Sequence, residues 1–172
     1  QTYRRELRLL PALGLLLGGW LALGGLLSWV AGDFRTMASL SSFLAVLAVG
    51  AGLLALGWLL MRCESAPGWL LWAAVLAFLL RLGFGAAWYQ LLPALGHGTP
   101  AEKAGYIMAD ASARDQSAWK LAQSEKALTA AFMNNRMSDQ YGGLLFLSAL
   151  TYRYLGGPTH QPLLIVILTA AF

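Results

Sequence analysis

Two long runs of the sequence carry no charged residue, Leu9–Ala31 and Met37–Met61. Each is longer than the roughly 20 residues that cross the hydrocarbon core of a bilayer as an α-helix. A third run, Pro67–Leu92, is interrupted only by Arg81 and is also expected to span. Hydrophobic residues make up 58% of the chain and charged residues 12%, with a mean hydropathy of +0.59. This composition excludes a soluble globular domain and indicates an integral membrane protein.

Two further apolar runs follow a polar segment, Tyr141–Leu155 and Pro162–Phe172. Counting both gives an all-α polytopic membrane protein with about five transmembrane helices and amphipathic helices in an outer loop. The last run covers only about half of a bilayer core of roughly 30 Å. We therefore expect the chain to continue beyond Phe172.

The order of these runs predicts two parts. Residues 1–66 form an N-terminal pair of transmembrane helices. Residues 67–172 contain a third membrane helix, the polar loop with its amphipathic helices and the two helices that follow.

The charged residues predict the orientation in the membrane. Arg4, Arg5 and Arg8 lie at the edge of the first apolar run and favour a cytoplasmic N-terminus. Three crossings then place residues 93–140 on the outer face. The net charge of +4 comes from basic residues that mostly flank apolar runs. The expected partner is therefore the lipid bilayer and not a nucleic acid.

Between Thr99 and Asn135 the composition changes abruptly from apolar residues to mixed charges with alanine. The helix propensities of these residues predict one or two helices along the membrane surface. Pro100 marks the start, with Glu102 in the first turn, and Asn134-Asn135 supplies a turn signal at the end. Its apolar residues are expected to form a stripe that rests on lipid or on the membrane helices: Ile107, Ala111, Ala118, Trp119 and Ala122.

One acidic residue of this segment lacks a local counter-charge. Asp110 is followed four residues later by Arg114, a spacing that allows an ordinary ion pair on a helix surface. Asp115 instead has Trp119 at that spacing. An unpaired acid beside an aromatic residue and near a membrane face is a candidate for chemistry. The alternative is a solvated surface carboxylate without a function.

Residues 115–122, DQSAWKLA, resemble the first outer-loop motif of GT-C glycosyltransferases, in which an acidic pair precedes an aromatic residue and a small apolar helix. Residues 138–145, SDQYGGLL, and 150–157, LTYRYLGG, are similar to the region where that family re-enters the membrane. Among its branches, the protein O-mannosyltransferase and aminoarabinose transferase relatives are the most similar. The resemblance covers residues 67–172.

The resemblance implies an activity and a set of site residues. Such enzymes transfer a sugar from a polyprenyl-phosphate lipid to an acceptor hydroxyl at the outer membrane face. Asp115 would be the catalytic residue that accepts the acceptor's proton. Asp139 would bind the acceptor or the donor, Arg136 would contact the phosphate and Trp119 would bind substrate. For Asp139 and Arg136 the alternative is an ordinary loop charge without a function. Arg81, inside an apolar run, is a candidate for binding the lipid phosphate or for pairing within the helix bundle.

The sequence also departs from the family pattern. Gln116 replaces the second acid of the pair, which weakens a two-carboxylate or metal-assisted mechanism, although a divalent metal remains a candidate cofactor. His160 and Gln161 stand where an arginine often opens the next helix.

The replaced motif residues and the glycine-rich apolar runs support a second hypothesis, from a different class of function. The chain would then be a non-catalytic accessory or structural subunit that works with other membrane subunits. A haem-binding role is weak because His97 and His160 lie at the ends of the predicted spans. No P-loop, GxGxxG, HExxH or GxSxG pattern is present in the sequence.

Overall fold

The computed structural model describes residues 2–32, 37–133 and 142–171, and it describes side chains from residue 16 in the first range and residue 39 in the second. All regular secondary structure in these ranges is helical, which confirms the expected all-α class. The elements are α1 (Thr2–Val30), α2 (Met37–Cys63), α3 (Trp69–Leu95), α4 (Pro100–Lys103), α5 (Ala109–Gln123), the 3-10 helix η1 (Leu128–Phe132), α6 (Gly143–Tyr154) and α7 (Leu163–Ala170).

Two of the described helices are long and apolar enough to cross a membrane, α2 over Ser39–Cys63 and α3 over Trp69–Leu95. Only 22% of the most apolar part of α2 and 11% of that of α3 are buried inside the protein. The core helix of a soluble protein would be covered by its neighbours, so this exposed apolar surface supports membrane association. The described apolar part of α1, Leu16–Val30, is shorter.

The prediction of about five spanning helices is not confirmed, because α6 and α7 are short. α6 has 12 residues and α7 has 8. At about 1.5 Å per residue they extend over about 18 Å and about 12 Å, well below a bilayer core of roughly 30 Å. A glycine in the left-handed region, Gly142 with φ +69°, precedes α6, and Pro162 marks the start of α7.

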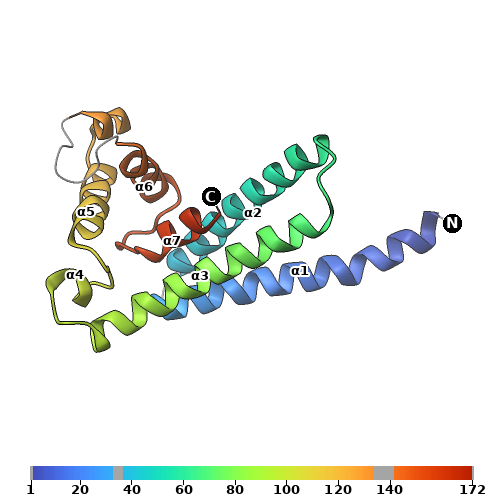
Figure 1. The fold of residues 1–172 in the computed structure, drawn as a ribbon, viewed down its shortest axis with the longest axis horizontal. Helices are drawn as coiled ribbons and strands as arrows, with labels where there is room; N and C mark the ends of the chain where they lie inside the picture. The colour runs from blue at the N-terminus through green and yellow to red at the C-terminus, as the bar shows by residue number, and fades with distance from the viewer. Residues whose placement is uncertain (1, 33–36, 134–141, 172) are drawn as a thin grey trace.

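The three long helices α1, α2 and α3 form an elongated layer, and the shorter helices collect at one end of it (Figure 1). The chain leaves α3 at this end and forms α4, α5, η1 and α6, which we call the cap. α7 then turns back and packs on α2 and α3. The N-terminus lies at the end of the molecule opposite the cap (Figure 1).

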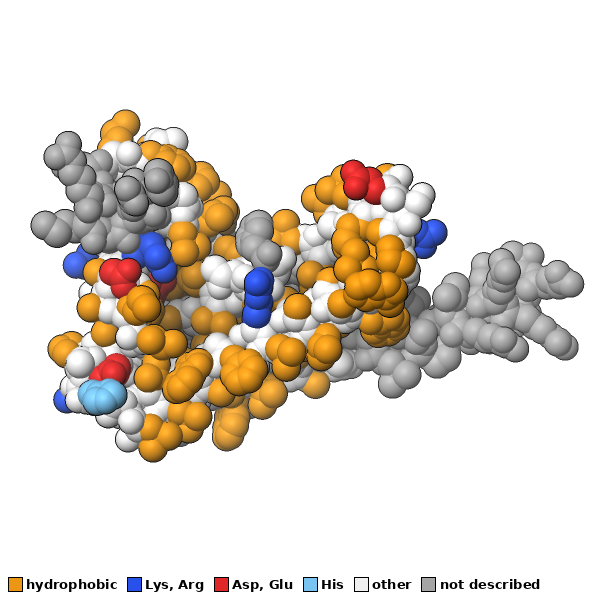
Figure 2. All heavy atoms as spheres, in the orientation of Figure 1, with side chains coloured by type: hydrophobic (Ala, Val, Ile, Leu, Met, Phe, Trp, Pro, Cys, Tyr) orange, Lys and Arg blue, Asp and Glu red, His pale blue; other side chains and the backbone are white. Residues whose placement is uncertain are grey.

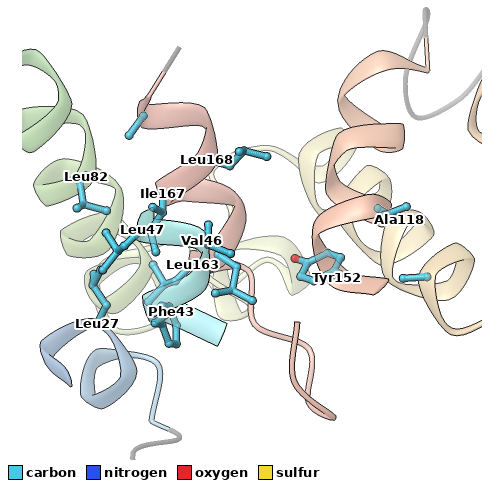
Figure 3. Packing of buried hydrophobic residues seen from close by; sticks show 14 of the residues in the cluster. Leu27, Phe43, Val46, Leu47, Leu82, Ala118, Tyr152, Leu163, Ile167 and Leu168 are labelled. Carbon is cyan, nitrogen blue, oxygen red and sulfur yellow. The ribbon is translucent and has the colours of Figure 1, made fainter. Parts of the chain in front are cut away.

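The core follows α7 and continues into the cap. Figure 3 shows side chains of α1, α2 and α3 gathered around α7, with Tyr152 of α6 and Ala118 of α5 lying further off. All of them belong to one cluster of buried residues. α3 and α7 come very close at Gly85, where an added Cβ would collide with Cγ1 of Val166. Figure 2 shows hydrophobic side chains spread over the surface of the long helices.

The polar segment forms more pieces than expected. The predicted start at Pro100 is confirmed, because Thr99 and Glu102 form a capping box there. Hydrogen bonds from the Thr99 amide and hydroxyl lower the pKa of Glu102 to about 2. Gly105, with φ +83°, then separates α4 from α5. The predicted end at Asn134-Asn135 lies outside the described residues.

The expected apolar stripe is formed only in part. Ala118 and Ala122 are buried, and Ala111 and Trp119 are half-buried. Ile107 is 62% exposed because α5 begins only at Ala109, so helical spacing does not apply to it. The buried face of α5 packs mainly against α6.

Candidate functional site

The buried face of α5 carries an acidic residue. Ser112, Asp115, Ala118 and Ala122 recur every three or four residues and are the buried residues of this helix. The two alanines are small enough to let α6 approach closely. Asp115 is therefore only 6% exposed, and the alternative of a solvated surface carboxylate is wrong for this residue.

Three side chains from other parts of the chain bind the Asp115 carboxylate. The Tyr152 hydroxyl, on α6, lies 2.8 Å from Oδ1 and 2.9 Å from Oδ2. Nε2 of His160, in the segment before α7, lies 2.7 Å from Oδ2. The Tyr106 hydroxyl, between α4 and α5, also donates to Oδ2. A carboxylate offers about four lone-pair positions, so these contacts occupy most of its capacity.

Burial, together with the charge of Asp115, keeps its partner Tyr106 protonated. Burial and the nearby negative charge of Asp115, in that order, raise the pKa of Tyr106 far above its usual value. A phenol that does not ionise remains a hydrogen-bond donor at every physiological pH. The network therefore directs donors onto a buried carboxylate, which compensates its loss of water.

Aromatic rings hold His160 in place. Its imidazole lies on Trp119 with the ring centroids 5.3 Å apart and the planes at 31°. Tyr152 meets the imidazole nearly edge-on, at 5.3 Å and 67°, and meets Trp119 at 5.4 Å and 89°. The predicted substrate-binding residue Trp119 thus packs directly against two side chains that contact Asp115.

A cavity of about 180 Å³ lies beside Asp115. Helices α3 and α7 supply much of its wall, including Gly85, Tyr89 and Val166. Arg114 also lines it, and the predicted Asp110–Arg114 ion pair does not occur among the described side chains. The cavity is smaller than the roughly 300–1,000 Å³ of most small-molecule sites.

The remaining predicted site residues are not assembled around Asp115. Arg81 is exposed near the middle of α3 and forms no ion pair with any described residue. It lies one helical turn from Gly85, on the same side of α3 as the cavity wall. Asp139 and Arg136 lie outside the described residues.

Sequence reasoning missed Tyr106, Tyr152 and His160 as partners of Asp115. Tyr152 and His160 are 37 and 45 residues away along the chain, so no helical spacing relates them to the acid. The one signal in the sequence was the position of His160, where the resemblance leads one to expect an arginine.

Within the described ranges, no group of three or more His, Cys, Asp or Glu residues could hold a metal ion, so these residues do not identify ligands for the candidate divalent metal. Comparison of the chain with protein-family models, curated proteins and solved structures finds no match.

Proposed function

We propose that this chain is the N-terminal part of a membrane glycosyltransferase that uses a sugar carried on a polyprenyl phosphate. The observation that carries the proposal is the buried Asp115 carboxylate, which borders a cavity whose wall includes an apolar, membrane-length helix. An acidic group beside a membrane-spanning helix can act on a substrate whose reactive part is polar and whose tail lies in the lipid. The motif at residues 115–122 resembles the outer loop of this enzyme class.

The proposed topology follows the length of α2 and α3 and the charges at the N-terminus. The N-terminus is cytoplasmic, and α1, α2 and α3 cross the membrane in turn. Residues 93–140, which include α4, α5 and η1, then lie on the outer face.

In the proposed sugar transfer, a carboxylate promotes removal of the proton from the acceptor hydroxyl. The acceptor oxygen attacks C1 of the sugar, and the bond between C1 and the lipid phosphate oxygen breaks with its electron pair on the phosphate. The negative charge of Asp115 favours proton transfer away from the acceptor. Cationic groups are then needed to stabilise the leaving phosphate.

Arg81 is the proposed contact for that lipid phosphate. Its guanidinium is exposed within an apolar helix, which is a costly position unless an anion or water meets it. The half-buried Arg114 lines the cavity itself and is a second candidate cation. Trp119, Asp139 and Arg136 remain the proposed substrate-binding residues.

The test is an Asp115→Asn substitution in the complete protein, assayed for transfer from a polyprenyl-phosphate sugar. Loss of proton-transfer assistance should lower the rate about 10²–10⁴-fold. Asp110→Asn is the matched control, because Asp110 is exposed on the same helix. Its turnover should stay close to that of the unaltered protein.

Retained turnover in Asp115→Asn would remove Asp115 from the reaction. Failure of the unaltered complete protein to transfer any polyprenyl-linked sugar, combined with stable association with other membrane proteins, would instead favour an accessory subunit. The small size of the cavity agrees with such a role.

A further inference from the structure

We infer that His160 is the group that takes the proton and that Asp115 acts through it, so the site contains a histidine–aspartate pair. This inference rests on the proposed transfer reaction and names the accepting atom, Nδ1 of His160. The Asp115 carboxylate is itself enclosed, with its side chain 8% exposed. The His160 side chain is 28% exposed and is the more accessible member of the pair.

The hydrogen-bond network assigns the histidine tautomer. An ionised carboxylate only accepts hydrogen bonds, so the 2.7 Å contact between Nε2 of His160 and Oδ2 of Asp115 requires the proton on Nε2. In the neutral imidazole, Nδ1 then carries the free lone pair. Among the described residues no hydrogen bond to Nδ1 occurs, and we place the substrate hydroxyl at this atom.

The surroundings of the ring suit an orienting role for Asp115. Trp119 and Tyr152 restrict the imidazole, and the bond to Asp115 fixes its rotation. The titratable groups that face it are Asp115 on α5, Tyr152 on α6 and, through their shared contact with Asp115, Tyr106. Both tyrosines donate to the carboxylate, so Asp115 is the one negative charge beside the ring among the described residues.

The proton and electron pairs balance in the resulting step. The acceptor O–H bond breaks, its proton moves to Nδ1 and a bond forms between the acceptor oxygen and C1 of the sugar. The C1–phosphate bond breaks and its electron pair leaves with the phosphate. The imidazolium that forms is stabilised by Asp115 and later returns the proton to water or to the released phosphate.

The first test compares substitutions in the complete protein. His160→Gln keeps an amide donor for Asp115 but has no basic nitrogen, and should lower turnover about 10²–10⁴-fold. His97→Gln is the control, because the His97 side chain is 95% exposed and contacts Glu102 instead of Asp115. If Asp115 were itself the base, His160→Gln would retain turnover to within about tenfold, and that result would overturn the inference.

A spectrum adds a readout that a merely structural role of His160 would not move. The ¹⁵N NMR spectrum of the histidines in the unaltered protein should show His160 protonated at Nε2 with a free Nδ1. A proton on Nδ1 instead would contradict the assignment, even if the variant failed to fold.

The two proposals fail differently. Unchanged turnover in both Asp115→Asn and His160→Gln would refute the proposed reaction site. Loss of turnover in Asp115→Asn alone would leave the transferase proposal standing and refute the histidine–aspartate pair.

Discussion

At the scale of single residues, the site is dominated by the cost of burying one charge. A buried carboxylate is tolerated only when donors replace the water it has lost. Tyr106, Tyr152 and His160 fulfil this need at Asp115. Each donor comes from a different part of the chain, so the charge ties the cap to the segment that leads into α7.

Removing one donor should therefore cost stability. Tyr152→Phe deletes the hydroxyl that contacts both oxygens of Asp115, and hydrogen bonds to charged groups are worth about 1.5–3 kcal/mol. We expect the free energy of unfolding in detergent to fall by about that amount. Tyr154→Phe, at a 69% exposed position on the same helix, should change it by less than about 0.5 kcal/mol. Equal effects of the two substitutions would contradict this account.

At the scale of elements, two contacts hold the cap and α7 in place. Arg153 of α6 donates to the carbonyl oxygens of Leu121, Ala122, Ser124 and Lys126, at 2.6–3.1 Å. These carbonyls lie at and beyond the C-terminus of α5, where backbone acceptors lack helical partners. The second contact is the close approach of α3 and α7 at Gly85, which positions one wall of the cavity.

Gly85→Ala tests this approach. The added methyl group would meet Val166 and should cost about 1–3 kcal/mol, more than the roughly 0.5–1 kcal/mol that alanine contributes to helix stability over glycine. Net destabilisation is therefore expected in thermal unfolding. Gly83→Ala is the matched control in the same helix, since nothing lies within 4 Å of its added Cβ. If Gly85→Ala were as stable as Gly83→Ala, α3 and α7 would not be in contact there.

At the scale of the whole molecule, the cap and the turn between α2 and α3 lie at opposite ends of α3 (Figure 1). A membrane crossed by α3 must therefore separate them. Charged side chains appear at both ends in Figure 2, whereas the long helices between them carry mostly hydrophobic side chains, with a basic side chain midway. The single cysteine, Cys63, is exposed at the end of α2. Labelling it therefore shows on which side of the membrane the turn between α2 and α3 lies.

Labelling with a membrane-impermeant maleimide tests the sidedness. In intact cells Cys63 should be protected and should react only after the membrane is permeabilised, because the proposed topology places it in the cytoplasm. A cysteine at the exposed position 120, introduced as Lys120→Cys with Cys63→Ser, should react without permeabilisation. Labelling of both positions from the same side would show that α3 does not cross the membrane.

The sequence by itself determined the helical class, the membrane-length helices α2 and α3 and the start of the polar segment at Pro100. These depend on local properties: uninterrupted apolar residues, helix propensity and a capping box within four residues. It also singled out Asp115, through the absence of a counter-charge at helical spacing. The proposed roles of Arg81, Asp139 and Arg136 remain predictions.

Only the tertiary structure decided what surrounds Asp115. Tyr152 and His160 reach the carboxylate because α6 packs on the alanine face of α5 and the segment before α7 folds back toward it. Contacts between residues so far apart leave no periodic trace in a single sequence, because they depend on how helices pack and not on local propensity. For the same reason the cavity beside Asp115, whose walls come from α3, α5, α6 and α7, was visible only in three dimensions.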